Sequence, residues 1–103
     1  MIFIWLDDER EMPTTKYHEY KMFHAHNYEE CIEIIDYALS RGEPIYIHFD
    51  HDLGAEKSGY DVAKYIVTNE IPLKYFSIHS MNPAGTMNIY KLLSHYGYEY
   101  TRL

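Results

Sequence analysis

The stretch that decides the fold is Ile45-Tyr46-Ile47-His48-Phe49-Asp50-His51-Asp52, a mostly apolar run of strand length that ends in three chemically active residues. A second run, Ile2-Phe3-Ile4-Trp5-Leu6, is continuously apolar, as is typical of a strand covered on both faces, and it ends in Asp7-Asp8. In an open parallel sheet, ligands bind in the crevice outside the carboxyl ends of the strands. Acids at two such ends therefore predict one shared site.

Strand and helix patterns alternate along the chain. Strands are expected at residues 2–6, 20–24, 45–49, 74–78 and 98–102. Three helices are expected between them: one capped by Asn27 and Glu30, one from about Gly59 to Pro72, and one from Asn82-Pro83 to Gly97. Residues 7–18 are polar and contain Pro13, which predicts an irregular connection, and no helix is expected after the last strand.

This alternation is what parallel crossovers require. We predict one α/β domain over residues 1–103, with a flavodoxin-like, doubly wound, five-stranded parallel sheet in a three-layer α/β/α arrangement. The chain of 103 residues is long enough for one modest core.

Composition restricts the class of partner. The formal net charge of -7 disfavours electrostatic capture of duplex DNA, so small substrates or RNA ends fit better. Cys31 is the only cysteine, which excludes an internal disulfide and predicts a reducing compartment. The apolar start is too short for a membrane span or a secretory signal, so the expected location is cytoplasmic. The sequence leaves the oligomeric state open.

Four acids are candidate metal ligands: Asp7, Asp8, Asp50 and Asp52. Carboxylates gathered at one crevice repel one another unless a cation lies between them. An oxygen-rich donor set favours Mg²⁺ or Mn²⁺, and a histidine ligand such as His51 would favour Mn²⁺. The alternative interpretation is a set of solvated loop acids, with Asp52 as a turn or cap residue.

Two histidines at predicted strand ends, His51 and His79, are candidates for a general base, a general acid or a metal ligand. Each could instead be a hydrogen-bonded core group. His48 lies inside a predicted strand and is expected to be a satisfied core histidine. The remaining histidines, at positions 18, 24, 26 and 95, are expected at the surface.

Three further residues are candidates for binding a phosphate. Ser80 and Asn82 could donate hydrogen bonds to it, and the helix that begins near Pro83 would direct backbone amides towards an anion. Asn82 could equally be a simple helix cap. Arg10 could grip a phosphate with two donors, or form a salt bridge with a neighbouring glutamate.

Three motifs in this order resemble the cyclic-phosphate processing receiver-like domain family over nearly the whole chain. They are Leu6-Asp7-Asp8-Glu9-Arg10 with Pro13, Phe49-Asp50-His51-Asp52-Leu53-Gly54 with Gly59-Tyr60-Asp61, and His79-Ser80-Met81-Asn82-Pro83 with Gly85 and Asn88. That family is related to response-regulator receivers, whose acids at equivalent strand ends hold magnesium.

The resemblance implies that Asp7, Asp8 and Asp50 bind the metal. It also implies that His51, Asp52 and His79 are the polar groups that distinguish this family from signalling receivers, and that Ser80 and Asn82 contact the substrate. The chain departs from receivers at its last predicted strand, Tyr100-Thr101-Arg102-Leu103, which carries no lysine. A phosphorylation switch therefore loses support.

Two functions are compatible with these residues. The first is a metal-dependent phosphoesterase that opens a cyclic phosphate, either a 2',3'-cyclic RNA end or a cyclic nucleotide, with Asp50, His51 and His79 as catalytic residues. Either water or Asp50 could be the nucleophile. The second is a receiver-like module that binds phosphate or is phosphorylated without turnover. Loss of turnover in His79→Ala with metal binding retained would favour the enzyme.

Overall fold

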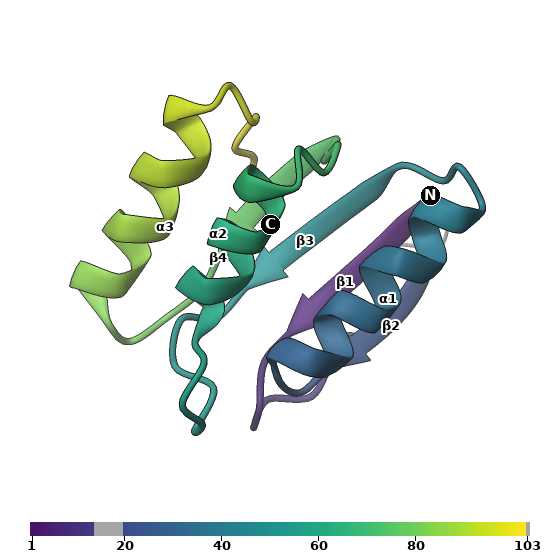
Figure 1. Cartoon of the computed structure of the whole chain (residues 1–103). Helices are drawn as coiled ribbons and strands as arrows, with labels where there is room; N and C mark the ends of the chain where they lie inside the picture. Colours follow the sequence, from purple (N-terminus) through teal and green to yellow (C-terminus); the bar gives the residue numbers. More distant parts are fainter. Residues whose placement is uncertain (14–19, 103) are drawn as a thin grey trace.

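A computed structural model of the chain describes residues 1–13 and 20–102 (Figure 1). Its elements are β1 (Ile2–Leu6), β2 (Lys21–Ala25), α1 (Tyr28–Ser40), β3 (Ile45–Phe49), α2 (Gly59–Thr68), β4 (Tyr75–Ile78) and α3 (Pro83–His95). The strands predicted at 2–6 and 45–49 have those bounds, and those predicted at 20–24 and 74–78 differ by one residue at their ends. All three predicted helices are present.

The strands form a parallel sheet in the order β2-β1-β3-β4, as the flavodoxin-like arrangement predicts. The fifth strand is not confirmed, because the segment at 98–102 makes only one isolated bridge, between Tyr100 and Phe76. Two backbone hydrogen bonds hold it there, from the Phe76 amide to Glu99 and from the Thr101 amide to Phe76. Pairing at one residue lines this segment up beside β4 without extending the sheet. No helix follows it in the described residues.

All three helices pack on one face of the sheet, so the described residues form two layers and the predicted three-layer arrangement is wrong for them (Figure 1). The cause is the direction of the connections. From β2 to the 98–102 segment, each crossover moves the same way across the sheet, and right-handed crossovers then place every helix on the same side. The connection from β1 to β2 runs the other way. Residues 7–13 of it contain no helix, and residues 14–19, with His18, lie outside the described residues.

Alternation along the strands gives the two faces different compositions. On the helix side, Ile2, Ile4 and Leu6 of β1 join one large apolar core with the buried residues of all three helices. On the other side, Phe3 and Trp5 form a small aromatic cluster with Tyr46 of β3. Residues at even spacing share a face, so Asp7 continues the second row.

Side-chain caps begin the helices. Ser58 and Asp61 form a reciprocal capping box at α2. At α1, Asn27 accepts from the Glu30 amide as predicted, but the Glu30 carboxylate accepts from the His26 amide instead of closing the box. No helix in the described part of the chain is long and apolar enough to cross a membrane.

Candidate active site

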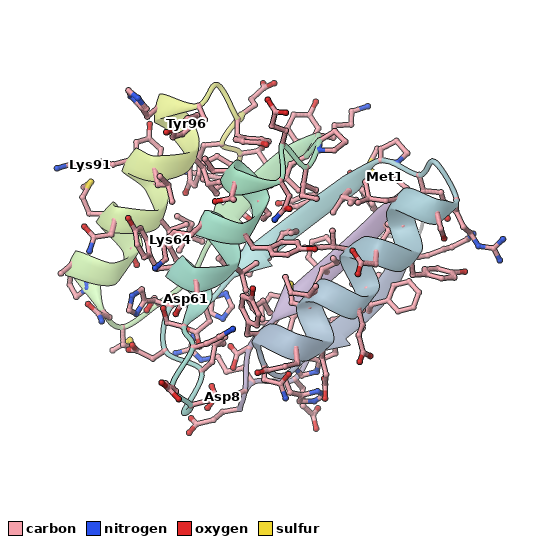
Figure 2. All side chains as sticks on the ribbon, in the orientation of Figure 1. Met1, Asp8, Asp61, Lys64, Lys91 and Tyr96 are labelled. Carbon is pink, nitrogen blue, oxygen red and sulfur yellow. The ribbon has the colours of Figure 1, made fainter. Side chains whose placement is uncertain are left out.

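Two aspartates and one histidine converge at the carboxyl ends of three neighbouring strands. Asp7 follows β1, Asp50 follows β3 and His79 follows β4, and one potential ligand atom from each lies within 4.8 Å of the others. We call this group the carboxylate arm. Asp8, the next residue after Asp7, is seen in Figure 2 at the end of β1 opposite to Met1. The predicted shared crevice therefore has a physical centre at Asp7, Asp50 and His79.

Asp7 is the most strongly held member of this arm. It is 1% exposed, its Oδ1 accepts from the backbone amides of Glu9 and Arg10 at 2.8 Å each, and its Oδ2 contacts Nε2 of His79 at 2.5 Å. Burial raises the pKa of Asp7, but the hydrogen bonds from Arg10, His79 and Glu9 outweigh it and leave the pKa below its ordinary value. Asp7 is thus a fixed carboxylate.

Asp50 is shifted in the opposite direction. Burial raises its pKa, and the negative charges of Asp7 and Asp8 raise it further. Its own surroundings thus oppose its negative charge. Asp8 lies close by, with its Oδ2 2.7 Å from the position that a Cβ on Gly54 would take.

Two rings, those of Trp5 and His48, lie nearly parallel to the ring of His79 and form the floor under it. The ring of His79 stacks on Trp5 with centroids 4.6 Å apart and on His48 at 4.3 Å, and Trp5 stacks on His48 at 4.7 Å. Trp5 and His48 face each other across β1 and β3 in register. The floor therefore restricts the tilt of His79 while Asp7 holds its edge.

His48 differs from the satisfied core histidine that we predicted. It is buried and its Nδ1 makes a short contact with the hydroxyl of Ser77, but its Nε2 has no hydrogen-bond partner among the described residues. Burial, followed by the charge of His79, lowers the pKa of His48 to about 3. His48 is therefore neutral at physiological pH and supports His79 by stacking alone.

A second group of side chains surrounds His51, and we call His51, Asp52 and Asn82 the histidine arm. Nδ1 of His51 contacts the Asp52 carboxylate at 2.9 Å, and the Asn82 amide lies 3.4 Å from both. Nε2 of His51 has no hydrogen-bond partner within the described ranges 1–13 and 20–102. A carboxylate on Nδ1 favours the tautomer with the proton there, which leaves Nε2 as an acceptor.

Glycines let the helices approach both arms. A Cβ on Gly85 of α3 would lie 2.3 Å from the His51 ring, and one on Gly59 of α2 would lie 2.1 Å from the backbone oxygen of Asp50. The Gly59 amide also donates to the His51 carbonyl at 2.8 Å. Only a residue without Cβ allows these contacts, so Gly59 and Gly85 position Asp50 and His51.

The other predicted site residues have diverse surroundings. Asp52 belongs to the histidine arm and not to the cluster of potential ligand atoms. Asn82 caps α3 by accepting from the Gly85 amide at 2.9 Å while its amide faces Asp52, so the cap and the site use one side chain. The Ser80 hydroxyl accepts from the backbone amide of Asn82. Arg10 is exposed, and its guanidinium makes no ion pair with any residue the structure describes, so the predicted alternative of a bridge to a neighbouring glutamate is not seen.

Sequence reasoning overlooked four residues that build the site: Trp5, His24, His48 in its stacking role, and Ser77. His24 was expected at the surface, but it is partly buried and its Nε2 lies 2.7 Å from the Asp7 carbonyl oxygen. Trp5, His24 and His48 share one cross-strand register, with Ser77 opposite His48. Trp5, His48 and Ser77 each lie two positions before Asp7, Asp50 or His79 on the same face, which was the available signal, whereas no such signal marked His24.

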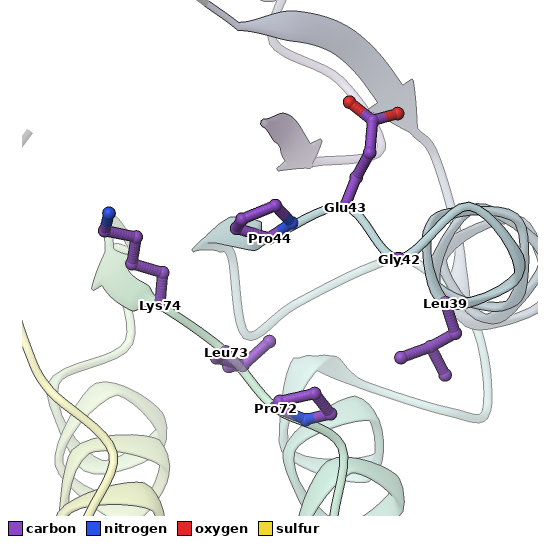
Figure 3. Close-up of a pocket in the computed structure, with 7 residues that line it drawn as sticks. All are labelled: Leu39, Gly42, Glu43, Pro44, Pro72, Leu73 and Lys74. Atoms are coloured by element: carbon purple, nitrogen blue, oxygen red, sulfur yellow. The ribbon is translucent and has the colours of Figure 1, made fainter.

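The opposite end of the sheet carries a hollow of about 480 Å³ that takes no part in this chemistry. Figure 3 shows its lining residues, among them Leu39, Pro72 and Leu73, where α1 ends and the chain enters β3 and β4. Its surface is mainly apolar, and it lies at the amino ends of the strands, away from Asp7 and Asp50. This hollow therefore does not mark the functional site.

Comparison with known proteins assigns the family. The sequence profile of the cyclic-phosphate processing receiver domain matches residues 2–95. The chain belongs to this family. No curated protein and no solved structure gives a significant match. For this receiver domain the profile covers both arms of the site and all seven helices and strands.

The metal that the receiver relationship implies fits the carboxylate arm. Two carboxylates and one imidazole are donors that Mg²⁺ or Mn²⁺ accepts, and Asp7 Oδ2 has a lone pair beyond the one used by His79, whereas Oδ1 is occupied by the Glu9 and Arg10 amides. Burial, followed by the charges of Asp7 and Asp8, raises the pKa of Asp50, and a cation between the carboxylates would offset these effects.

Proposed function

We propose that this receiver domain is a metal-dependent phosphoesterase that opens a cyclic phosphate, either a 2',3'-cyclic RNA end or a cyclic nucleotide. The observation that carries the proposal is the pairing of the two arms. A partly buried cluster of two carboxylates and a histidine suits a cation and its phosphate, and a histidine and carboxylate pair beside it suits proton transfer.

Asp7 and Asp50 would hold the cation, with Asp8 close by. When bound, such a cation neutralises phosphate charge and makes the phosphorus more electrophilic. Arg10 follows the first acidic pair and has no competing ion pair among the described residues, so its guanidinium is free to bind the phosphate in two-pronged fashion.

His51 is the residue best suited to act as general base. Its Nδ1 is engaged by Asp52, which stabilises the proton there, and its Nε2 is available to take a proton from an attacking water. A new bond then forms between water oxygen and phosphorus while one bond from phosphorus to the ribose oxygen breaks. A Glu, Asp or His placed in this way typically contributes a factor of about 10² to 10⁴ in rate.

The departing ribose oxygen needs a proton, and His79 is the second carrier in reach. Its Nε2 shares a proton with Asp7, and the ring is held against Trp5. Asp50 as nucleophile, with a phosphoaspartate formed and then hydrolysed, remains the competing route for the same overall reaction. Trapping of phosphate on Asp50 during turnover would select that route.

The test is phosphorus NMR of 2',3'-cyclic and 3',5'-cyclic nucleotides with the protein and Mg²⁺ or Mn²⁺. Ring opening by the wild type is expected, with strong loss in Asp50→Asn and His51→Ala. His95→Ala is the matched control, because His95 is an exposed histidine at the far end of α3.

The contrary result is absence of ring opening with every substrate and metal, together with labelling of Asp50 by acetyl phosphate. That pair of results would replace the enzyme with the phosphoacceptor module. The bond that opens, identified from the product, also distinguishes an RNA-end substrate from a cyclic nucleotide.

A further inference from the structure

An uncharged aromatic hollow lies beside the histidine-bearing end of β4. Its volume is about 360 Å³, and it is lined by Ile78, Thr86, Met87, Tyr90 and Tyr100. Three of these come from α3, one from the end of β4 and one from the 98–102 segment. No charged side chain is among its lining residues, which is notable in a chain with a net charge of -7.

Two residues that line the hollow are sequence neighbours of residues that belong to, or position, the two arms. Ile78 immediately precedes His79, and Thr86 immediately follows Gly85, whose missing Cβ makes room for the His51 ring. Adjacent Cα atoms are about 3.8 Å apart. The side chains of Ile78 and His79 point to opposite faces of the sheet, so a ligand with its phosphate at the carboxylate arm would have to pass the end of β4, where Ser80 and Asn82 lie, to enter this hollow.

The lining residues present ring faces and a thioether rather than a closed core. Tyr90, Tyr100 and Met87 are 41%, 40% and 49% exposed. The two tyrosine rings lie 5.4 Å apart at 80°, and each also packs on buried Phe76, at 6.4 and 5.5 Å. Rigid, half-exposed aromatic rings can stack with a nucleobase and need not contact its phosphate.

The hollow also contains one unpaired polar group. The hydroxyl of Thr86 is buried and has no hydrogen-bond partner among the residues the structure describes. Buried polar groups are nearly always paired, and a helical threonine has two accessible χ1 rotamers. Rotation of this hydroxyl towards the hollow would satisfy it with the edge of a bound base.

We propose that this hollow is the nucleobase subsite of the receiver domain, so that its substrate is a nucleoside cyclic phosphate. The inference rests on the proposed function and adds the place where the base of its substrate binds. The chemistry of the two places supports this proposal. The carboxylate arm, with a cation, suits the anionic phosphate of such a molecule, and the uncharged aromatic hollow suits its flat, neutral base. Its volume is at the small end of ligand sites, which fits one base and not a longer strand.

The first test compares adenosine 2',3'-cyclic phosphate with glycerol 1,2-cyclic phosphate, which has the ring and no base. Tyr90→Ala should lower kcat/KM for the adenosine compound about tenfold, the loss expected for one base stacking contact, and leave the glycerol compound unchanged. Tyr37→Ala is the matched control, because Tyr37 is a tyrosine of equal exposure, 40%, on α1. Equal effects of Tyr90→Ala on both substrates would overturn the subsite.

The second test needs neither turnover nor a variant. Methyl NMR of ¹³C-labelled methionine is followed while adenosine, without phosphate or metal, is added to the wild type. A saturable shift of Met87 with Met22 unmoved supports the subsite even if no cyclic phosphate is hydrolysed, so failure of the enzyme and failure of the subsite are distinguishable. Absence of a Met87 shift overturns the subsite, and so does a Met87 shift that follows protein concentration alone, which would assign the face to self-association.

Discussion

The two arms of the site lie side by side in the chain, with Asp50 next to His51, yet they differ in exposure. The Asp7 side chain is 2% exposed, whereas that of Asp52 is 63% exposed. Charges within the carboxylate arm therefore interact through a medium of low effective dielectric, and they shift the pKa values of Asp7 and Asp50 in opposite directions. In the histidine arm it is Asp52 that faces water, whereas the His51 side chain is 20% exposed, close to the 16% of His79. The contrast between Asp7 and Asp52 suggests that one arm holds charge and the other transfers protons.

The largest expected effect is a loss of turnover without a loss of metal affinity, which would separate proton transfer from metal binding. His51→Ala should lower turnover by about 10² to 10⁴ while leaving metal affinity nearly unchanged, because it removes only the general base. Turnover is measured by phosphorus NMR. Metal affinity is measured by fluorescence of Trp5, which is the only tryptophan and stacks on His79 4.6 Å away.

Asp7→Asn serves as the opposite control for that experiment. It keeps an oxygen for the Glu9 and Arg10 amides but removes the charge, so metal affinity should fall along with turnover. If His51→Ala weakened the metal as much as Asp7→Asn does, the two arms would be one unit and the division would be wrong.

The next largest effect is expected from a substitution in α3 that displaces His51 without changing any residue of the histidine arm. Gly85→Ala places a Cβ 2.3 Å from the His51 ring and should displace it, so turnover should approach that of His51→Ala. Gly97→Ala is the matched control: its φ is +87°, so alanine is strained there, but nothing lies within 4 Å. It should cost about 1 kcal/mol of unfolding free energy and leave turnover intact. Chemical denaturation and phosphorus NMR on both variants check this, and loss of turnover in Gly97→Ala would show that stability alone controls activity.

Within the carboxylate arm, two similar substitutions should change stability in opposite directions when no metal is present. Asp7→Asn should lower the unfolding free energy by about 1.5 to 3 kcal/mol, because it weakens hydrogen bonds to a charged group. Asp50→Asn should raise it, because its raised pKa means that the folded state disfavours its charge. Urea denaturation with a chelator present measures both.

The pH dependence has the same two signs. The lowered pKa of Asp7 contributes stability above its unfolded value of about 3.9, and that stability is lost as pH falls through the lower folded value. The raised pKa of Asp50 works in reverse, because stability is lost as pH rises from the unfolded value through the higher folded one. The advantage of Asp50→Asn should therefore grow from acidic towards neutral pH. A constant difference would refute the assigned pKa direction.

Sequence reasoning worked best where burial is complete. β1 and β3 are buried at all five positions, so their apolar runs mark their bounds without ambiguity. Acids that directly follow such strands must lie at the carboxyl edge in a parallel sheet. This is why Asp7, Asp50 and His79 could be expected at one edge before any geometry was known.

The sequence could not separate the four acids into their groups. Asp7 and Asp50 continue the alternation of their strands, on the face that carries Trp5 and His48, whereas the loop after β3 turns Asp52 away to His51 and Asn82. Loop direction depends on tertiary contacts such as the Gly59 amide with the His51 carbonyl. The two-layer arrangement was likewise a consequence of strand order and crossover handedness, which local patterns do not encode.

The smallest effect tests the exposed arm by itself. Asp52→Asn keeps the side chain's size and a hydrogen-bond acceptor at the position that contacts Nδ1 of His51, and it removes only a charge. An ion pair in water contributes about 1 kcal/mol or less, so kcat should fall less than tenfold and metal affinity should not change. Asp36→Asn, which removes a charge from an exposed position on α1, controls for the altered net charge. A fall as large as that of His51→Ala would mean that the histidine arm is shielded from water when substrate is bound, and the contrast in exposure between the arms would then hold only for the free protein.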